Sequence, residues 1–178
     1  MADVKAAIDA VLHQEDETLS GKIVNVRGDT GGTTRFGLAM KWHPELCGTR
    51  YYTTMSNADA LQVAVNTLNA QYAESMQIAA IADQALATKF LSYGVNAGNR
   101  VAIWTMQRAV NAVLPNSSLD VPVDGWCGPS TIAAITRCMP QSLLNAFRLQ
   151  MIQFYAGLCN QRAADRNELL GWVNRALA

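Results

Sequence analysis

The chain has 178 residues, of which half are apolar and 16% are charged. This length and composition are typical of a folded globular domain with a core of its own, and they exclude a disordered or charge-driven chain. The 14 Lys and Arg residues balance the 14 Asp and Glu residues, so the net charge is zero and no nucleic-acid partner is expected.

The amino-terminal segment, MADVKAAIDAVLHQEDE, lacks the basic and then apolar stretch of a secretory signal peptide. No segment approaches the ~18 consecutive apolar residues of a membrane span, so membrane insertion is not expected. The sequence therefore predicts a chain made in the cytoplasm, and a substrate outside the cytoplasm would require a separate delivery route.

The cysteines and histidines match no CxxC or HExxH metal pattern. No metal or other cofactor is therefore predicted. We expect buried or half-buried thiols at Cys47, Cys127, Cys138 and Cys159. A disulfide between Cys127 and Cys138 is the alternative if the protein works in an oxidising compartment.

Residues 3–19 are predicted to form an amphipathic helix. One face of this helix carries Val4, Ile8, Val11, Leu12 and Glu15. Glu15 stands where the apolar stripe would otherwise place another leucine, and a partly desolvated carboxyl group favours its protonated form. A glycosidase general acid needs such a proton for the leaving oxygen. The alternative is that the helix ends by residue 14 and Glu15 faces water.

The next segment, LSGKIVNVRGDTGGTTRFG, is expected to be a loop with a short strand at 23–26 and a tight turn at Gly31-Gly32. Paired glycines let the backbone approach a substrate closely, because no Cβ intervenes. The Asp29 carboxylate and the hydroxyls of Thr33 and Thr34 are suited to binding a sugar or orienting a water. The alternative is an ordinary glycine-rich turn. The phosphate-binding patterns GxxxxGK[ST] and GxGxxG are absent.

The rest of the chain is predicted to be helical. Thr33 or Thr34 would cap a helix over 36–42 that Pro44 stops, and Ser56 with Asp59 forms a capping box for the next helix. Further helices are expected over 79–93, 100–113, 131–137, 141–161 and 168–177. The Pro-, Gly- and Ser-rich connector at 114–130 is the one candidate for a subdomain boundary. The prediction is a mostly α fold of roughly six to eight helices, with a small irregular or β region after the first helix.

The order VLHQE, then DTGGTTRFGLA, then KWHPEL resembles the glycoside hydrolase family 108 muramidases. These enzymes carry a glutamate at the end of the first helix, followed by a D-x-GG-x-T-x-x-G-I/L segment. In this chain DETL follows Glu15 in place of the usual two glycines and tyrosine, and the interval to Asp29 is longer. Glu17 is therefore the alternative acid. Glu15 is preferred because VLxxE matches in register and because Glu15 lies on the apolar stripe.

The carboxy-terminal half continues this resemblance. YGVNAGNRVAIWTMQRAVN, VDGWCGPSTIAAI and GWVNR are similar to the predicted peptidoglycan-binding region that follows this family. The matching positions are Asn96, Gly98, Gln107, Asp124, Gly125, Gly128, Pro129 and Thr131. They are suited to shaping the fold as well as to touching glycan. We expect a single compact domain over 1–178, with the catalytic motifs in 1–78 and a helical part that resembles the peptidoglycan-binding region in 79–178.

The resemblance implies a lysozyme-like α fold and hydrolysis of the β-1,4 bond between N-acetylmuramic acid and N-acetylglucosamine. Glu15 would protonate the glycosidic oxygen as an oxocarbenium-like transition state forms. Asp29 is the candidate for the second carboxylate, which activates water; alternatively, it holds the glycine turn. The substrate-binding candidates are Gly31, Gly32, Thr33, Thr34, Tyr51 and Tyr93. The two tyrosines, like Tyr52, would stack on sugar faces or else belong to the core or its rim.

Two alternatives stay open at this point: a lytic transglycosylase, which needs the acid but no base for water, and a non-catalytic cell-wall-binding module. The expected partner is the peptidoglycan glycan strand, in the periplasm or on the cell wall. A holin would deliver a phage endolysin there, and a secretion system would deliver a bacteriolytic toxin effector. An effector would have a cognate immunity protein that plugs the cleft.

Overall fold

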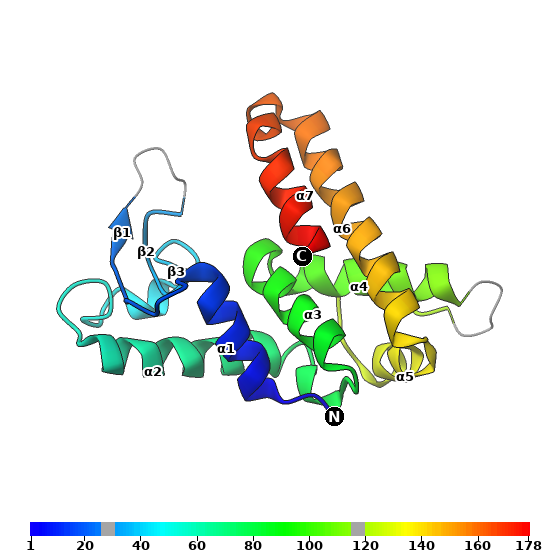
Figure 1. Ribbon diagram of the computed structural model, residues 1–178, viewed down its shortest axis with the longest axis horizontal. Helices are drawn as coiled ribbons and strands as arrows, with labels where there is room; N and C mark the ends of the chain where they lie inside the picture. Colours follow the sequence, from blue (N-terminus) through cyan, green and yellow to red (C-terminus); the bar gives the residue numbers. More distant parts are fainter. Residues whose placement is uncertain (26–30, 115–119) are drawn as a thin grey trace.

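The computed structural model describes residues 1–25, 31–114 and 120–178. As predicted, the fold is mostly helical, and a small antiparallel sheet in the order β1-β2-β3 follows the first helix (Figure 1). The elements in chain order are α1 (Val4–Glu15), β1 (Val24–Asn25), β2 (Thr33–Arg35), β3 (Leu38–Ala39), the 3-10 turn η1 (Pro44–Leu46), α2 (Asn57–Thr67), the π-helical stretch η2 (Leu68–Ala73), the 3-10 turn η3 (Ile78–Ala80), α3 (Gln84–Ala97), α4 (Asn99–Val113), α5 (Pro129–Arg137), α6 (Pro140–Gln161), the 3-10 turn η4 (Ala163–Asn167) and α7 (Leu169–Leu177).

Helix α1 ends at Glu15, four residues before the predicted end at residue 19. It begins where the Asp3 carboxylate accepts a hydrogen bond from the backbone N–H of Ala6. It ends because Asp16 adopts an extended backbone, and the Asp16 carboxylate accepts the backbone N–H groups of Ser20 and Gly21. An aspartate that bonds local backbone in this way competes with helix continuation. The buried face of α1 packs against α3 and consists of Ala7, Ile8, Val11 and Leu12.

The predicted helix over 36–42 is wrong, because this part of the chain forms a β-hairpin. Arg35 on β2 pairs with Leu38 on β3. The two residues between them have positive φ, +47° at Phe36 and +77° at Gly37. Positive φ at both central positions is the signature of a type I′ turn, which joins twisted antiparallel strands and is incompatible with a right-handed helix. Pro44 then begins η1 instead of ending a helix.

The capping box at the start of α2 is confirmed. The Ser56 hydroxyl accepts the backbone N–H of Asp59 and donates to the Asp59 carboxylate. Helix α2 then widens directly into the π-helical stretch η2, and a left-handed residue, Gln77, stops the run. Short π-helical stretches inside helices are frequent at functional sites.

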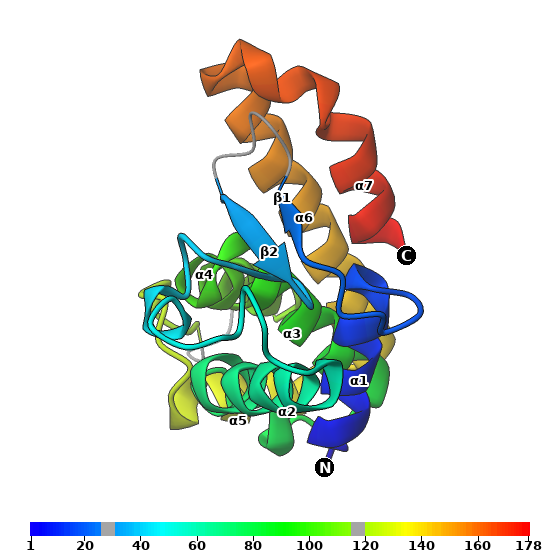
Figure 2. The same ribbon diagram turned by 90° about the vertical axis from the view of Figure 1, so that its left-hand side faces the viewer.

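Helix α3 occupies the centre of the molecule, with α1 on one side and α4 on the other (Figures 1 and 2). It begins at Gln84, not residue 79, because the Asp83 carboxylate caps it by accepting the Leu86 N–H. It ends at Gly98, whose φ is +90°. Helix α6 packs across α4, and α7 returns along α6. Edge-to-face aromatic rings fill the contact between α3 and α6: Phe90, Tyr93, Phe147 and Tyr155.

The segment before α5 is shaped by one buried side chain, Gln107 of α4. Its Nε2 donates to the Asp124 carboxylate at 2.8 Å and to the Trp126 carbonyl at 3.0 Å, and its Oε1 accepts the Gly125 N–H. These contacts show that the DGWCGP motif has a structural role. Cys127, Cys138 and Cys159 are buried free thiols, so the alternative of a disulfide between Cys127 and Cys138 is wrong. Cys47 is a free thiol as well, but it is exposed, so the expectation of a buried or half-buried thiol is wrong at this position.

None of the helices within the described ranges combines the length and the apolar character that crossing a membrane requires.

Candidate active site

Glu15 is the last residue of α1 and lies at a small hollow beside the β2–β3 hairpin. We call this hollow the Glu15 cavity; its volume is about 200 Å³. Its lining residues are Glu15, Asp16, Ser20, Lys22, Val24, Thr34, Arg35, Phe36 and Gly37. The Glu15 side chain itself is exposed. The partial desolvation expected from the helical pattern is therefore wrong for the free protein, because the helix ends at this residue and its buried face stops at Leu12.

The turn of the hairpin holds the stem of Glu15 in place. A Cβ added to Gly37 would lie 2.8 Å from the Cγ and 3.0 Å from the Cβ of Glu15. These distances are shorter than ordinary van der Waals contact. Gly37 is thus required twice, once for its positive φ and once for its close approach to Glu15. The glycine that ends the DTGGTTRFG segment therefore links this motif to the glutamate of the first helix.

Three neighbouring carboxylates are candidates for the general acid, those of Glu15, Asp16 and Glu17, and the geometry favours Glu15. Asp16 is committed to the loop: burial opposes its ionisation, but hydrogen bonds from Ser20 and Gly21 outweigh this effect and lower its pKa. Glu17 is exposed and lines neither the Glu15 cavity nor the second cavity described below. Within the described ranges, no hydrogen bond or ion pair engages the Glu15 carboxylate, which leaves it available to a substrate.

Arg35, the last residue of β2, ties the loops around this cavity together. It is buried, and its guanidinium donates to the Gly21 carbonyl at 2.9 Å, the Tyr51 carbonyl at 2.7 Å and the Asn57 side-chain oxygen at 2.6 Å. A further hydrogen bond reaches the Met55 carbonyl. The planar fork of an arginine suits such multiple contacts. Arg35 makes no ion pair with Glu15, so the cation organises the backbone and leaves the acid unpaired.

The residues predicted in the glycine-rich segment fall at several places. Thr34 lines the Glu15 cavity, and its role as a substrate contact stays a prediction. The Thr33 hydroxyl instead accepts a hydrogen bond from Asn25 of β1. Gly31 is buried and its carbonyl accepts the N–H of Lys41. Gly32 has a φ of +76°, and no atom of the described residues lies within 4 Å of the position of a Cβ. Asp29 lies outside the described residues, so its role as second carboxylate stays a prediction.

The prediction that Tyr51 and Tyr93 stack on sugars is wrong. Their exposed fractions are 0% and 1%. The Tyr51 hydroxyl donates to the Arg35 carbonyl, and the Tyr93 ring packs edge-to-face against Phe147. A ring that is covered on both faces by protein has no face to offer a sugar. Both tyrosines belong to the core, as does Tyr52.

A second hollow adjoins the first at Gly37, which lines both. We call it the Trp42 cavity; its volume is about 400 Å³. Its lining residues are Gly37, Ala39, Trp42, His43, Gln71, Tyr72, Val95, Asn96, Ala97, Gly98 and Asn99. Trp42 is 65% exposed, and the Lys41 ammonium lies 4.6 Å from its ring centroid. Trp42 was predicted at the end of a helix and not as a site residue, because periodicity does not reveal which aromatic residue stays exposed.

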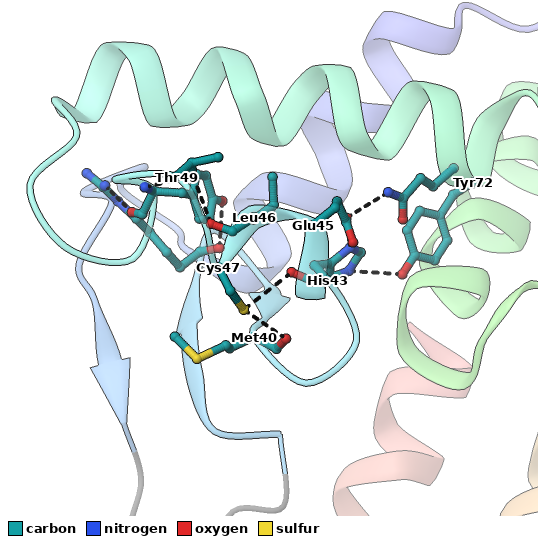
Figure 3. Close-up of polar contacts among 10 residues, drawn as sticks. Met40, His43, Glu45, Leu46, Cys47, Thr49 and Tyr72 are labelled. Atoms are coloured by element: carbon teal, nitrogen blue, oxygen red, sulfur yellow. Dashed lines mark hydrogen bonds and ion pairs between the residues drawn. The ribbon is translucent and has the colours of Figure 1, made fainter.

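One wall of the Trp42 cavity carries a chain of polar contacts (Figure 3). His43 is 3% exposed. Its Nδ1 lies 3.3 Å from the Glu45 carboxylate, and its Nε2 lies 3.2 Å from the Tyr72 hydroxyl. Gln71 donates to the same carboxylate of Glu45 at 2.8 Å. These polar contacts join the η1 turn to the π-helical stretch η2. No sequence pattern connects residues so far apart.

In the part of the chain that the structure describes, no group of three or more His, Cys, Asp or Glu side chains could hold a metal ion. The two cavities offer an unpaired carboxyl group, an exposed indole ring, the charged side chains of Asp16, Lys22 and Arg35, and neutral hydrogen-bonding groups. An acid beside an aromatic platform suits proton donation to a bound sugar.

The comparisons with known proteins agree with this arrangement. Residues 8–98, about half of the chain, match the family model described as "Glycosyl hydrolase 108", and residues 101–177 match the model described as "Predicted Peptidoglycan domain". Both cavities described above lie almost wholly within the first match. No curated protein matches this chain in sequence.

Among solved structures, the chain is similar to SagA of Brucella abortus, with a TM-score of 0.66 and 16% sequence identity. The similarity covers 96% of this chain and 95% of the SagA chain. At this identity the match shows a shared fold. The helical architecture with its small sheet after α1 fits a lysozyme-like fold, which confirms the expected fold class.

Proposed function

Because this chain belongs to the glycosyl hydrolase 108 family and carries a predicted peptidoglycan domain after the matched region, it is a glycoside hydrolase that acts on peptidoglycan, and we propose that it is a muramidase. The bond cleaved would be the β-1,4 linkage between N-acetylmuramic acid and N-acetylglucosamine. The observation that carries this proposal is the position of Glu15, an unpaired carboxyl group that lines one of two cavities and contacts Gly37, the residue that both cavities share.

Glu15 is proposed to act as the general acid. The two cavities adjoin at Gly37, the residue that contacts Glu15, so a glycan strand that occupies both would pass its scissile oxygen close to the carboxyl group. Such a strand would also exclude water from the carboxyl group of Glu15. Proton transfer to the glycosidic oxygen then accompanies the oxocarbenium-like transition state. Asp29 is our candidate for the carboxylate that activates the attacking water.

The first experiment compares the wild-type protein with Glu15→Gln on purified peptidoglycan sacculi, followed by loss of turbidity. The amide keeps the size of the side chain but has no acidic proton, so activity should fall by at least about a hundredfold, as expected for loss of general acid catalysis. Glu17→Gln is the matched control, because Glu17 is two residues away and lines neither cavity. An active Glu15→Gln protein, or an inactive Glu17→Gln protein, would overturn the assignment of the acid.

The released fragments identify the reaction. Mass spectrometry of the digest should show reducing N-acetylmuramic acid ends, as hydrolysis by water requires. Fragments that end in 1,6-anhydro-N-acetylmuramic acid would instead establish a lytic transglycosylase. Sacculi that wild type and Glu15→Gln leave equally intact would indicate a cell-wall-binding module without catalysis.

We further propose that the protein acts in the periplasm or on the cell wall after delivery by a secretion system or a holin, because its substrate lies outside the cytoplasmic membrane. Expression in the cytoplasm should then be tolerated. Fusion to a periplasmic signal sequence should lyse the host, and the same fusion carrying Glu15→Gln should not. A neighbouring gene for an immunity protein that rescues the host would support an effector, and a neighbouring holin gene would support an endolysin.

A further inference from the structure

Donor and acceptor roles can be assigned to the hydrogen bonds among Glu45, His43 and Tyr72 at the wall of the Trp42 cavity. Burial opposes ionisation of Glu45, but hydrogen bonds from Gln71, from the backbone N–H of Glu45 itself and from His43, together with charge attraction to His43, outweigh burial and lower the pKa of this carboxyl. An ionised carboxylate only accepts hydrogen bonds, so the Nδ1 of His43 donates to Glu45. In a neutral imidazole the other nitrogen is then an acceptor.

The end of this chain is the Tyr72 hydroxyl. Burial raises the pKa of Tyr72, so the group is a neutral phenol. When the His43 imidazole is neutral and carries its proton on Nδ1, the Tyr72 hydroxyl donates its proton to the Nε2 of His43, 3.2 Å away. The phenolic oxygen keeps its acceptor capacity for whatever enters the cavity that Tyr72 lines. The three residues together therefore present an oriented acceptor at this wall.

The other walls have a different chemistry. Trp42 is exposed and offers an indole face. Small apolar side chains, those of Ala39, Val95 and Ala97, line the cavity as well. An indole face suits the C–H face of a pyranose ring, and small apolar side chains suit a methyl group. A sugar that carries an N-acetyl group has all three complementary features: a C–H face, a methyl group and an amide N–H donor.

We propose that the Trp42 cavity is the subsite for one N-acetylated hexosamine next to the bond that Glu15 cleaves. Trp42 stacks on the sugar ring, and Tyr72, oriented by His43 and Glu45, accepts a hydrogen bond from the acetamido N–H. Tyr72 is then a specificity-determining contact, and His43 and Glu45 are positioning residues. The proposal rests on the proposed function, since it assigns one subsite of that glycan-binding site.

Binding is measured without turnover in the Glu15→Gln protein, by titration calorimetry with chitotetraose and with its fully de-N-acetylated counterpart. Adding Trp42→Ala should weaken chitotetraose binding by about tenfold, which is the upper range for an aromatic contact. Adding Tyr72→Phe should weaken it by roughly fivefold, the effect of one neutral hydrogen bond. Tyr72→Phe should also reduce the ratio of the affinity for chitotetraose to the affinity for its de-N-acetylated counterpart. Tyr93→Phe is the matched control, because it removes a phenol that is buried and lines neither cavity.

A purely structural role for Tyr72 predicts a different outcome. If the role is structural, Tyr72→Phe lowers the melting temperature and the kcat on a soluble glycan. If Tyr72 is a subsite contact, Tyr72→Phe raises KM and leaves kcat and the melting temperature near those of Tyr93→Phe. Equal affinity of Glu15→Gln, Trp42→Ala/Glu15→Gln and Tyr72→Phe/Glu15→Gln for chitotetraose, or no binding by any of them, would overturn the proposal. Full lysis by Glu15→Gln would refute the proposed acid, and the KM and kcat of Tyr72→Phe and Trp42→Ala on the soluble glycan would then decide the subsite.

Discussion

The contact between Gly37 and Glu15 makes the substitution Gly37→Ala informative. Gly37 has a φ of +77°, and the added Cβ would lie 2.8 Å from the Cγ of Glu15. The methyl group therefore introduces two separate costs, one in the backbone and one in the packing. It changes neither the charge of the site nor the chemistry of the acid.

The backbone cost of placing an alanine in the left-handed region is about 1–2 kcal/mol. Ordinary carbon–carbon contact lies at roughly 3.5–4.0 Å, so the turn and Glu15 must separate by up to about 1 Å, and overpacking of this kind costs about 1–3 kcal/mol. The sum is about 2–5 kcal/mol of unfolding free energy. A misplacement of about 1 Å in a catalytic group is worth up to roughly a hundredfold in rate.

Gly32→Ala is the matched control for the backbone cost alone. Gly32 has almost the same φ, +76°, but among the residues that the structure describes no atom lies within 4 Å of an added Cβ. It should lose about 1–2 kcal/mol in urea unfolding, with a fall in melting temperature of roughly 2–4 °C for each kcal/mol. Gly37→Ala should lose more stability and, when it is folded, should clear sacculi far more slowly than wild type. Equal stability losses in the two variants, or wild-type clearing by Gly37→Ala, would show that the turn does not position Glu15.

Three further predictions concern the residues that support the site. Arg35→Lys should cost about 2–4 kcal/mol in urea unfolding, because a lysine cannot satisfy the buried acceptors that the guanidinium reaches; a loss under about 1 kcal/mol would contradict this reading. The pKa of Asp16 is lowered below its ordinary 3.8, so its carboxylate stabilises the fold above about pH 4 and ceases to do so as the pH falls through the lowered value. Asp16→Asn should therefore be less stable than wild type at pH 7 but not near pH 2. If urea titrations give the same difference in unfolding free energy between the two proteins at both pH values, this linkage is wrong. Gln107→Leu should cost about 2–3 kcal/mol, since it strips partners from Asp124 and the Gly125 N–H; an unchanged melting temperature would show that the DGWCGP segment holds its shape without this amide.

The amino-acid sequence predicted structure correctly where interactions between residues close in the sequence decide it. The helical period of the first segment and the pairing of Ser56 with Asp59 depend on residues only a few positions apart, and both were predicted. The family resemblance read from VLHQE and DTGGTTRFG is confirmed by the family match. Glu15 was identified as the candidate acid in the same way, and its assignment awaits the substitution experiments.

Local reasoning failed where a single backbone conformation or a long-range contact decides the outcome. The residues of 36–42 have helical apolar spacing, but positive φ at Phe36 and Gly37 turns them into a hairpin. Composition alone does not reveal that Phe36 adopts this conformation, because the strand pairing on either side of the turn imposes it.

The distribution of aromatic residues between core and cavity was also decided by tertiary structure. Tyr51 and Tyr93 are buried, whereas Trp42 stays exposed beside the site. His43 and Tyr72 are 29 residues apart and meet only because η1 packs near the π-helical stretch η2. The sequence alone determined the kind of fold and the residue types available for the chemistry, because periodicity and capping act over one or two turns. Which of those residues face the substrate depended on how the elements pack, since burial is a property of the assembled chain.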